Sequence, residues 1–188
     1  MDIRNKTVLF LGSSVTYGSA SGGVSFVDVI GDTCGCRCIK EAVSGTTLAD
    51  IGSTSYVSRL KAVPRDTAVD LFVCQLSTND AKRGIELCEV EGAIRFILDY
   101  VRDTFGCPIV FYTDTYFESE KYASMIELLY EIRREYGFYV LDLYNDAEMC
   151  AVSEEDRTRY MKDKVHPTLI GYKEWWTPKF IDFIARMP

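Results

Sequence analysis

The stretch Thr7-Val-Leu-Phe-Leu-Gly-Ser-Ser-Val-Thr-Tyr-Gly18 decides the fold class of this chain. Its first five residues are apolar or β-branched, which predicts a buried strand, and the Gly and Ser cluster after them predicts a tight exit turn. In an open α/β sheet, ligands bind just beyond the carboxyl ends of the strands. The two serines of this turn, Ser13 and Ser14, are therefore candidate nucleophiles, and their spacing alone does not separate them.

A base for such a serine is found near the C-terminus. A serine hydroxyl is a poor nucleophile until a neighbouring base accepts its proton. The chain has one histidine, His166, within the segment Asp163-Lys-Val-His-Pro167. Histidine suits the role because its unperturbed pKa of about 6.5 lets it accept and return a proton near neutrality. Asp163 can orient the imidazole if this segment forms a turn, and the chain order Ser, Asp, His is known among such triads.

Two N-terminal blocks resemble those of the SGNH (GDSL-like) hydrolases. Gly12-Ser-Ser-Val-Thr16 resembles the family's Gly-Asp-Ser-x-Thr block. This match assigns the nucleophile to Ser14 and puts Ser13 where the family usually has Asp. Val43-Ser-Gly-Thr-Thr47 resembles the block that supplies the oxyanion-hole glycine, here Gly45.

Two further blocks follow in the family's order. Leu76-Ser-Thr-Asn-Asp80 resembles Gly-x-Asn-Asp, with Ser77 in place of the glycine and Asn79 kept, and Asp163-x-x-His166 resembles the last block. Each block alone is weak, but four ordered blocks over nearly the whole chain are specific. A side chain at Ser77 is expected to narrow the floor of the site or to shift Asn79.

The resemblance implies a three-layer α/β/α fold with a flavodoxin-like parallel sheet, in one domain over residues 1–188. It also implies a serine esterase in which Ser14 attacks an ester carbonyl, His166 removes its proton and Asp163 orients the ring. The oxyanion donors would be the backbone amides of Ser14 and Gly45 and the side-chain amide of Asn79. Neither a metal nor an organic cofactor is expected.

The alternation of strand and helix patterns independently predicts a parallel sheet with helices on both faces. Strand patterns cover residues 7–11, 36–43, 70–76, 109–113 and 138–143. Helix patterns cover residues 25–30, 86–104 and 120–136, a run from Thr47 through Ile51, a start near Ser153, and a C-terminal helix through Tyr172 and Trp175 that restarts at Thr177. The loop of residues 114–117 should open on the same edge as Ser14.

Composition excludes several function classes. A net charge of −7 without a basic stripe argues against nucleic-acid binding. No apolar run is long enough for a signal peptide or a membrane span, so we expect a cytoplasmic protein. The odd count of seven cysteines then favours reduced thiols. Three of these thiols, Cys34, Cys36 and Cys38, would share one face of a strand, where small core residues are expected rather than a metal site.

The substrate is expected to be a small ester with a short acyl group, such as acetyl on a carbohydrate. Candidate contact residues are Ser13 and the aromatic Tyr17, Tyr116, Phe117, Trp175 and Trp176. A thioesterase or lysophospholipase of the same fold remains open. Two non-catalytic alternatives are a phosphate or nucleotide binder, which would use the backbone amides of the Ser13–Ser14 turn, and a binder of acylated sugars. The oligomeric state is left open.

Overall fold

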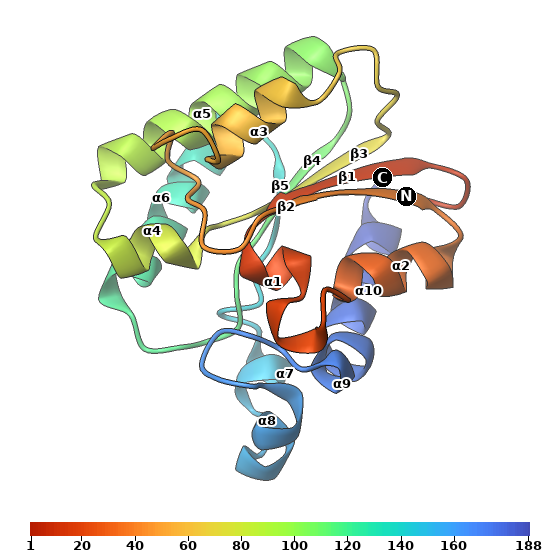
Figure 1. Cartoon of the computed structure of the whole chain (residues 1–188), viewed down its shortest axis with the longest axis vertical. Coiled ribbons are helices and arrows are strands. Elements are labelled where there is room, and N and C mark those ends of the chain that lie inside the picture. Colours follow the sequence, from red (N-terminus) through yellow and green to blue (C-terminus); the bar gives the residue numbers. More distant parts are fainter.

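Five parallel strands form one sheet in the order β2-β1-β3-β4-β5 in the computed structural model, which describes all residues from 1 to 188 (Figure 1). The strands are β1 (Thr7–Gly12), β2 (Arg37–Ala42), β3 (Leu71–Gln75), β4 (Ile109–Tyr112) and β5 (Tyr139–Leu141). Leu9 of β1 lies opposite both Ile39 and Phe72, so β1 has a hydrogen-bonded neighbour on each side. This position explains the unbroken apolar run, as strands of parallel sheets are buried on both faces.

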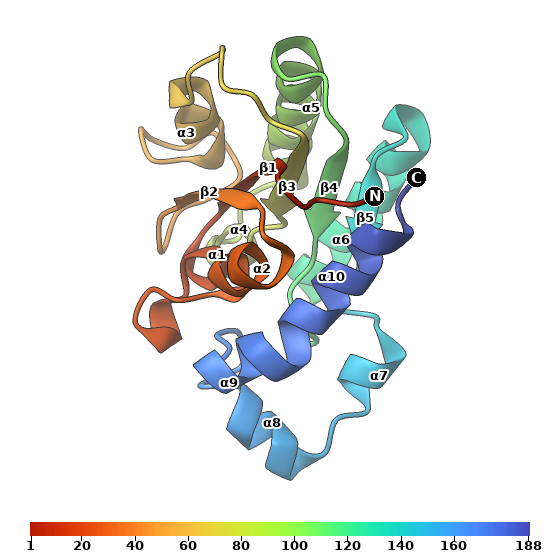
Figure 2. The same ribbon diagram turned by 90° about the vertical axis from the view of Figure 1, so that its right-hand side faces the viewer.

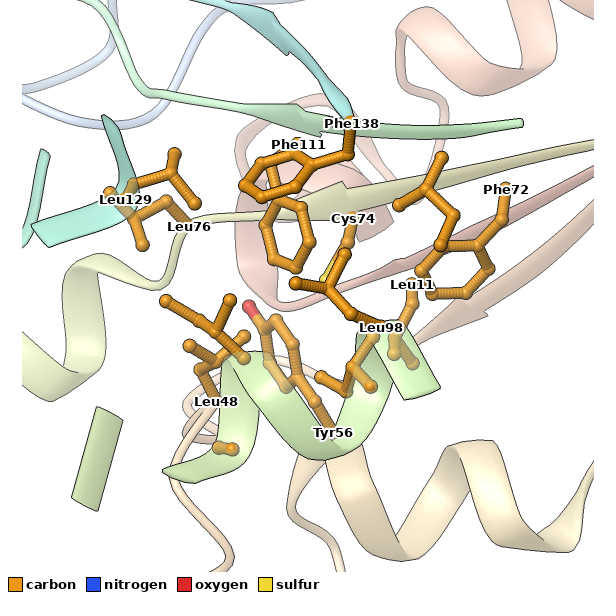
Figure 3. Close-up of a cluster of buried hydrophobic side chains, with 14 of the residues drawn as sticks. Leu11, Leu48, Tyr56, Phe72, Cys74, Leu76, Leu98, Phe111, Leu129 and Phe138 are labelled. Atoms are coloured by element: carbon orange, nitrogen blue, oxygen red, sulfur yellow. The ribbon is translucent and has the colours of Figure 1, made fainter. Parts of the chain in front are cut away.

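Helices cover both faces of the sheet, which confirms the three-layer α/β/α prediction. On one face lie α3 (Tyr56–Ala62), α5 (Leu87–Thr104) and α6 (Glu120–Tyr136), and on the other lie α2 (Phe26–Cys34) and α10 (Thr177–Arg186) (Figure 1). Alternate residues of β1 serve the two layers. Leu9 and Leu11 pack with α3, α5 and α6, whereas Val8 and Phe10 pack with α2 and α10. Figure 3 shows the first of these cores, where Tyr56 and Leu98 meet side chains of the sheet.

The remaining helices are short. They are α1 (Ser14–Tyr17), α4 (Thr78–Arg83), α7 (Ala147–Cys150), α8 (Glu154–Tyr160) and α9 (Leu169–Gly171), with a 3₁₀ turn at Ser19–Ser21 and a π-helical segment at Tyr172–Trp176. Figure 2 shows α7, α8 and α9 beyond one end of the sheet. The two termini lie together, since the Met1 amino group donates to the carbonyl of Ile184. None of the helices combines the length and hydrophobicity needed to cross a bilayer.

The predicted helix from Thr47 is wrong, because residues 47–55 form a loop. The Thr47 hydroxyl donates to the carbonyl of Ala49 at 3.0 Å and caps no helix. The amides of Leu48 and Ala49 donate to the carboxylate of Asp80, at 2.8 and 2.9 Å. The helix begins only at α3, where Ser55 accepts from the amide of Ser58. A partner 31 residues away therefore overrides the local helix pattern.

The cysteine segment also differs from its prediction. Cys34 ends α2, Cys36 lies just before β2, and only Cys38 is within that strand. The sulfurs of Cys36 and Cys38 lie 3.6 Å apart. All three thiols are partly buried against the core on the α2 side of the sheet. No group of three or more His, Cys, Asp or Glu side chains is placed to hold a metal ion.

Candidate active site

Ser14 lies at the carboxyl end of β1, where that strand gives way to α1 (Figure 1). The chain turns sharply after β1, and this brings Thr16 close to the backbone of Gly12. Only glycine fits there, because a Cβ at residue 12 would lie 1.7 Å from Oγ1 of Thr16. Ser14 keeps 8% of its surface exposed, whereas Ser13 is fully buried. The strand-to-helix turn therefore presents one of the two candidate serines to solvent.

His166 reaches Ser14 from the opposite end of the chain. Its Nε2 lies 2.8 Å from Oγ of Ser14, and its Nδ1 lies 2.9 Å from Oδ2 of Asp163. The loop that carries both residues is closed at its base, where the amide of Lys162 donates to the carbonyl of His166 at 2.8 Å. The geometry is that of a serine–histidine–aspartate triad, in which the imidazole can accept the Ser14 proton while the carboxylate orients the ring.

Asp163 is held as a carboxylate. Partial burial raises its pKa, but the backbone amides of Val165 and His166, each 2.8 Å from Oδ1, and the imidazole together outweigh burial. The net result is a pKa below the ordinary value for aspartate. An ionised Asp163 accepts the Nδ1–H of His166, which leaves Nε2 of His166 as the acceptor for the Ser14 hydroxyl.

Asn79 stands at the start of α4, close to the loop that contains Gly45. Its Nδ2 donates to the carbonyl of Thr46 at 2.9 Å, which uses one of two amide protons and leaves the other available to an oxyanion. Gly45 has a φ of 78°, a conformation that favours glycine, and its carbonyl accepts from Arg83 at 2.7 Å. Asp80 anchors the same loop through its bonds to residues 48 and 49. The two motifs predicted to supply oxyanion donors are thus joined directly.

Ser77 does not narrow the pocket. Its side chain is fully buried and is absent from the residues that line the space around Ser14. Its Oγ instead accepts from the backbone amide of Asn79 at 3.2 Å.

A pocket of about 450 Å³ contains Ser14 and His166. Phe117, Glu118 and Lys164 line it together with Asn79, and the first three also line an adjoining pocket of about 620 Å³. Tyr116 lies in the adjoining pocket and is 48% exposed. A larger hollow of about 900 Å³ lies at the amino edge of the sheet around residues 1–5 and holds none of the triad residues.

Four of the candidate substrate contacts line neither the pocket of Ser14 and His166 nor the one that adjoins it. The hydroxyl of Ser13 is buried 3.3 Å from Gln75. Tyr17 is exposed but lies under the ammonium group of Lys40, with 5.9 Å from Nζ to the ring centre. Trp175 and Trp176 are buried in the core beside α10. Phe117 and Tyr116 remain as the aromatic candidates.

Sequence reasoning missed two residues beneath the site, Gln75 and Arg59. Gln75 accepts from the amide of Ser13, and Arg59 donates to the carbonyl of Gly12. A polar residue within the otherwise apolar run of residues 71–76 could have drawn attention to Gln75. No pattern in the sequence distinguishes Arg59 from an ordinary helix-surface arginine.

Comparison with known proteins decides the family. The model of the GDSL-like lipase/acylhydrolase family matches residues 10–174. The chain belongs to this family. The match spans all four blocks of the candidate site, from the turn that holds Ser14 to the loop that holds His166. No curated protein matches the chain significantly.

Solved structures show that the chain has the SGNH-hydrolase fold. A protein from Lactobacillus plantarum superimposes with a TM-score of 0.84 at 20% identity, covering 98% of this chain and 99% of that one. The esterase AlinE4 of the SGNH-hydrolase family has a TM-score of 0.65 at 20% identity, with 98% of each chain covered. The acetyl xylan esterase AlAXEase has a TM-score of 0.76 at 13% identity, covering 96% of this chain and 100% of that one.

Proposed function

We propose that this hydrolase-family chain is a serine esterase that cleaves short-chain acyl esters, with acetyl esters of carbohydrates as the preferred class. The observation that carries the proposal is the 2.8 Å approach of Ser14 Oγ to His166 Nε2. In the reaction, Ser14 attacks the ester carbonyl as His166 takes its proton. His166 then protonates the departing alcohol, and a water activated by the same imidazole releases the acid from the acyl-enzyme.

The pocket supports a short acyl group. Nine of the twelve residues that line it are polar or charged, and Phe117 is the only phenylalanine, tyrosine or tryptophan among them. A long alkyl chain would need more apolar surface, because each buried methylene contributes about 0.8 kcal/mol only when it leaves water. The polar and charged side chains of the pocket suit a hydroxylated alcohol such as a sugar. One structural relative is described as an acetyl xylan esterase, which is consistent with this choice.

The test combines active-site labelling with turnover. A fluorophosphonate probe should label Ser14 in the wild type, as read by mass spectrometry, and aryl acetate should be hydrolysed faster than aryl octanoate. Ser14→Ala and His166→Ala should lose both labelling and turnover, while Ser124→Ala, at a half-buried serine on α6, should keep both. Release of acetate from acetylated xylose would then support the carbohydrate class.

Other results would point elsewhere. Preference for octanoate would favour a lysophospholipase, and faster cleavage of an acetyl thioester would favour a thioesterase. A folded wild-type protein that is neither labelled nor active, but is stabilised by nucleotides, would refute the esterase proposal.

A further inference from the structure

The peptide bond that precedes the nucleophile turn is held at both of its polar ends. Its oxygen, the carbonyl of Gly12, accepts from Nη2 of Arg59 at 2.8 Å. Its nitrogen, the amide of Ser13, donates to Oε1 of Gln75 at 2.9 Å. A peptide unit is planar, so two hydrogen bonds at its opposite ends fix the orientation of the whole plane. The next amide along the chain belongs to Ser14.

Gln75 is the only glutamine in the chain and is fully buried at the end of β3. Besides the Ser13 amide, its Oε1 faces the hydroxyls of Thr16 at 2.9 Å and Tyr56 at 3.4 Å. A backbone N–H can only donate, so the amide oxygen of Gln75, and not its nitrogen, must face Ser13. Several donors therefore converge on one acceptor under the turn.

Arg59 is a buried cation without a carboxylate partner. It is 9% exposed and no acidic side chain forms an ion pair with it. Its guanidinium instead donates to the carbonyls of Glu41 at 2.6 Å and Thr54 at 3.1 Å, as well as to Gly12. It also lies 3.3 Å from the hydroxyl of Thr46, beside the Gly45 loop. Burying a charge without a carboxylate partner is costly, so the three carbonyl hydrogen bonds of the guanidinium must offset that cost.

We propose that Arg59 and Gln75 are positioning residues that clamp the Gly12–Ser13 peptide and thereby orient the amide and hydroxyl of Ser14 for catalysis. The catalytic part of this inference rests on the proposed esterase function. Oxyanion donors are effective because they are fixed before charge develops, and a displacement of about 1 Å can cost about 100-fold in rate. Arg59 also ties the clamp to the Gly45 loop through Thr46, so both backbone donors share one support.

The test compares variants that remove the clamp with variants that keep part of it. Gln75→Met removes the acceptor at nearly constant length, and Gln75→Glu keeps an oxygen facing Ser13. Arg59→Met removes the guanidinium, and Arg59→Lys keeps the charge without the fork that reaches three carbonyls. Thr113→Val is the matched control, because it leaves the buried amide of Tyr144 without its acceptor but removes no hydrogen bond of the clamp.

The expected result is a loss of kcat without a loss of substrate binding. Gln75→Met and Arg59→Met should lower kcat and the rate of fluorophosphonate labelling about 10- to 100-fold, with KM within about twofold. Gln75→Glu should recover most of this loss, and Arg59→Lys should lie in between. The pH dependence of kcat/KM should stay unchanged, because neither Gln75 nor Arg59 transfers a proton in the proposed reaction.

A second readout does not need turnover. Amide hydrogen exchange in residues 12–17, measured by mass spectrometry, should speed up at least 10-fold in Gln75→Met and Arg59→Met but not in Thr113→Val. Folded variants with wild-type exchange in this segment would overturn the clamp, even if the wild type hydrolysed no ester. Faster exchange with wild-type kcat and labelling would overturn the catalytic part. The catalytic part would also be overturned if Gln75→Met and Arg59→Met lost no more kcat than Thr113→Val does.

Discussion

Gly171→Ala should damage both stability and catalysis, although alanine normally favours a helix. Gly171 has φ of −58° and ψ of −41°, so its backbone needs no glycine. An added Cβ would lie 2.1 Å from the carbonyl oxygen of Tyr160, which is about 1.2 Å inside the shortest ordinary carbon–oxygen contact of about 3.3 Å. That oxygen is fixed, because it accepts from the amide of Thr168 at 2.8 Å. Either α9 or the end of α8 must move.

The size of the effect follows from what would move. Overpacking of this kind costs about 1–3 kcal/mol, which corresponds to a Tm lower by about 2–12 °C in a chain of this size. Tyr160 immediately precedes the loop that holds Asp163 and His166, so a shift of about 1 Å should lower kcat up to about 100-fold. Thermal unfolding and steady-state hydrolysis of an aryl acetate measure the two effects.

Gly92→Ala provides the control. It lies within α5, where an added Cβ would meet no atom within 4 Å, so alanine should stabilise the protein by about 0.5–1 kcal/mol. If Gly171→Ala instead matched Gly92→Ala in Tm and kept wild-type kcat, the argument from the Tyr160 contact would be refuted.

Three further predictions concern polar groups around the site. Asn79→Ala should lower kcat about 10²- to 10³-fold at nearly constant KM in steady-state assays, because it removes a proposed oxyanion donor. An unchanged kcat would remove Asn79 from that role. The pKa of Asp163 is lowered in the folded protein, so its charge stabilises the fold above about pH 4, and this stabilisation is lost as the pH falls through the pKa of the folded state. The Tm of Asp163→Asn should therefore lie below the wild-type Tm at pH 6 and converge with it near pH 2. Burial, with a smaller contribution from the Asp163 charge, raises the pKa of Asp114 well above the ordinary value. Between the ordinary pKa and this raised pKa, the folded protein holds a proton that the unfolded chain releases, so the free energy of unfolding falls as the pH rises. Asp114→Asn should therefore raise Tm at pH 7 and lose this advantage near pH 4; an equal Tm of variant and wild type at pH 7 would contradict it.

The residues that the sequence could predict are those whose role depends on local chemistry. The apolar run of residues 7–11 predicted the first strand. The chain has one histidine, with an aspartate three residues before it, so only one residue was a candidate for the histidine base. Parallel topology then brings the carboxyl end of β1 and the C-terminal loop to one edge. Ser14 and His166, 152 residues apart, meet there.

Residues whose role depends on distant partners could not be predicted. Residues 47–55 carry a helix-like pattern, but the Asp80 carboxylate takes their first amides and holds a loop. Ser13 precedes Ser14 and Tyr17 follows it by three residues, yet the turn directs Ser13 into the protein and Tyr17 toward Lys40. Arg59 was missed because its acceptors are backbone carbonyls of β1, β2 and a loop. Every residue has such a carbonyl, so the sequence does not show which ones bind Arg59.

Ser77 shows how a position that the family fills with glycine can carry a side chain without closing the site. Its φ of −76° and ψ of 122° are open to any residue, so the backbone does not require glycine. The serine is the N-cap of α4, and its Oγ accepts one of the amides that a helix start leaves unpaired. That amide belongs to Asn79, and the next residue is Asp80, which anchors the loop after Gly45. The side chain of Ser77 therefore supports the first turn of α4, where Asn79 donates to the carbonyl of Thr46. Glycine at residue 77 would remove a hydrogen bond and would not enlarge the pocket beside Ser14.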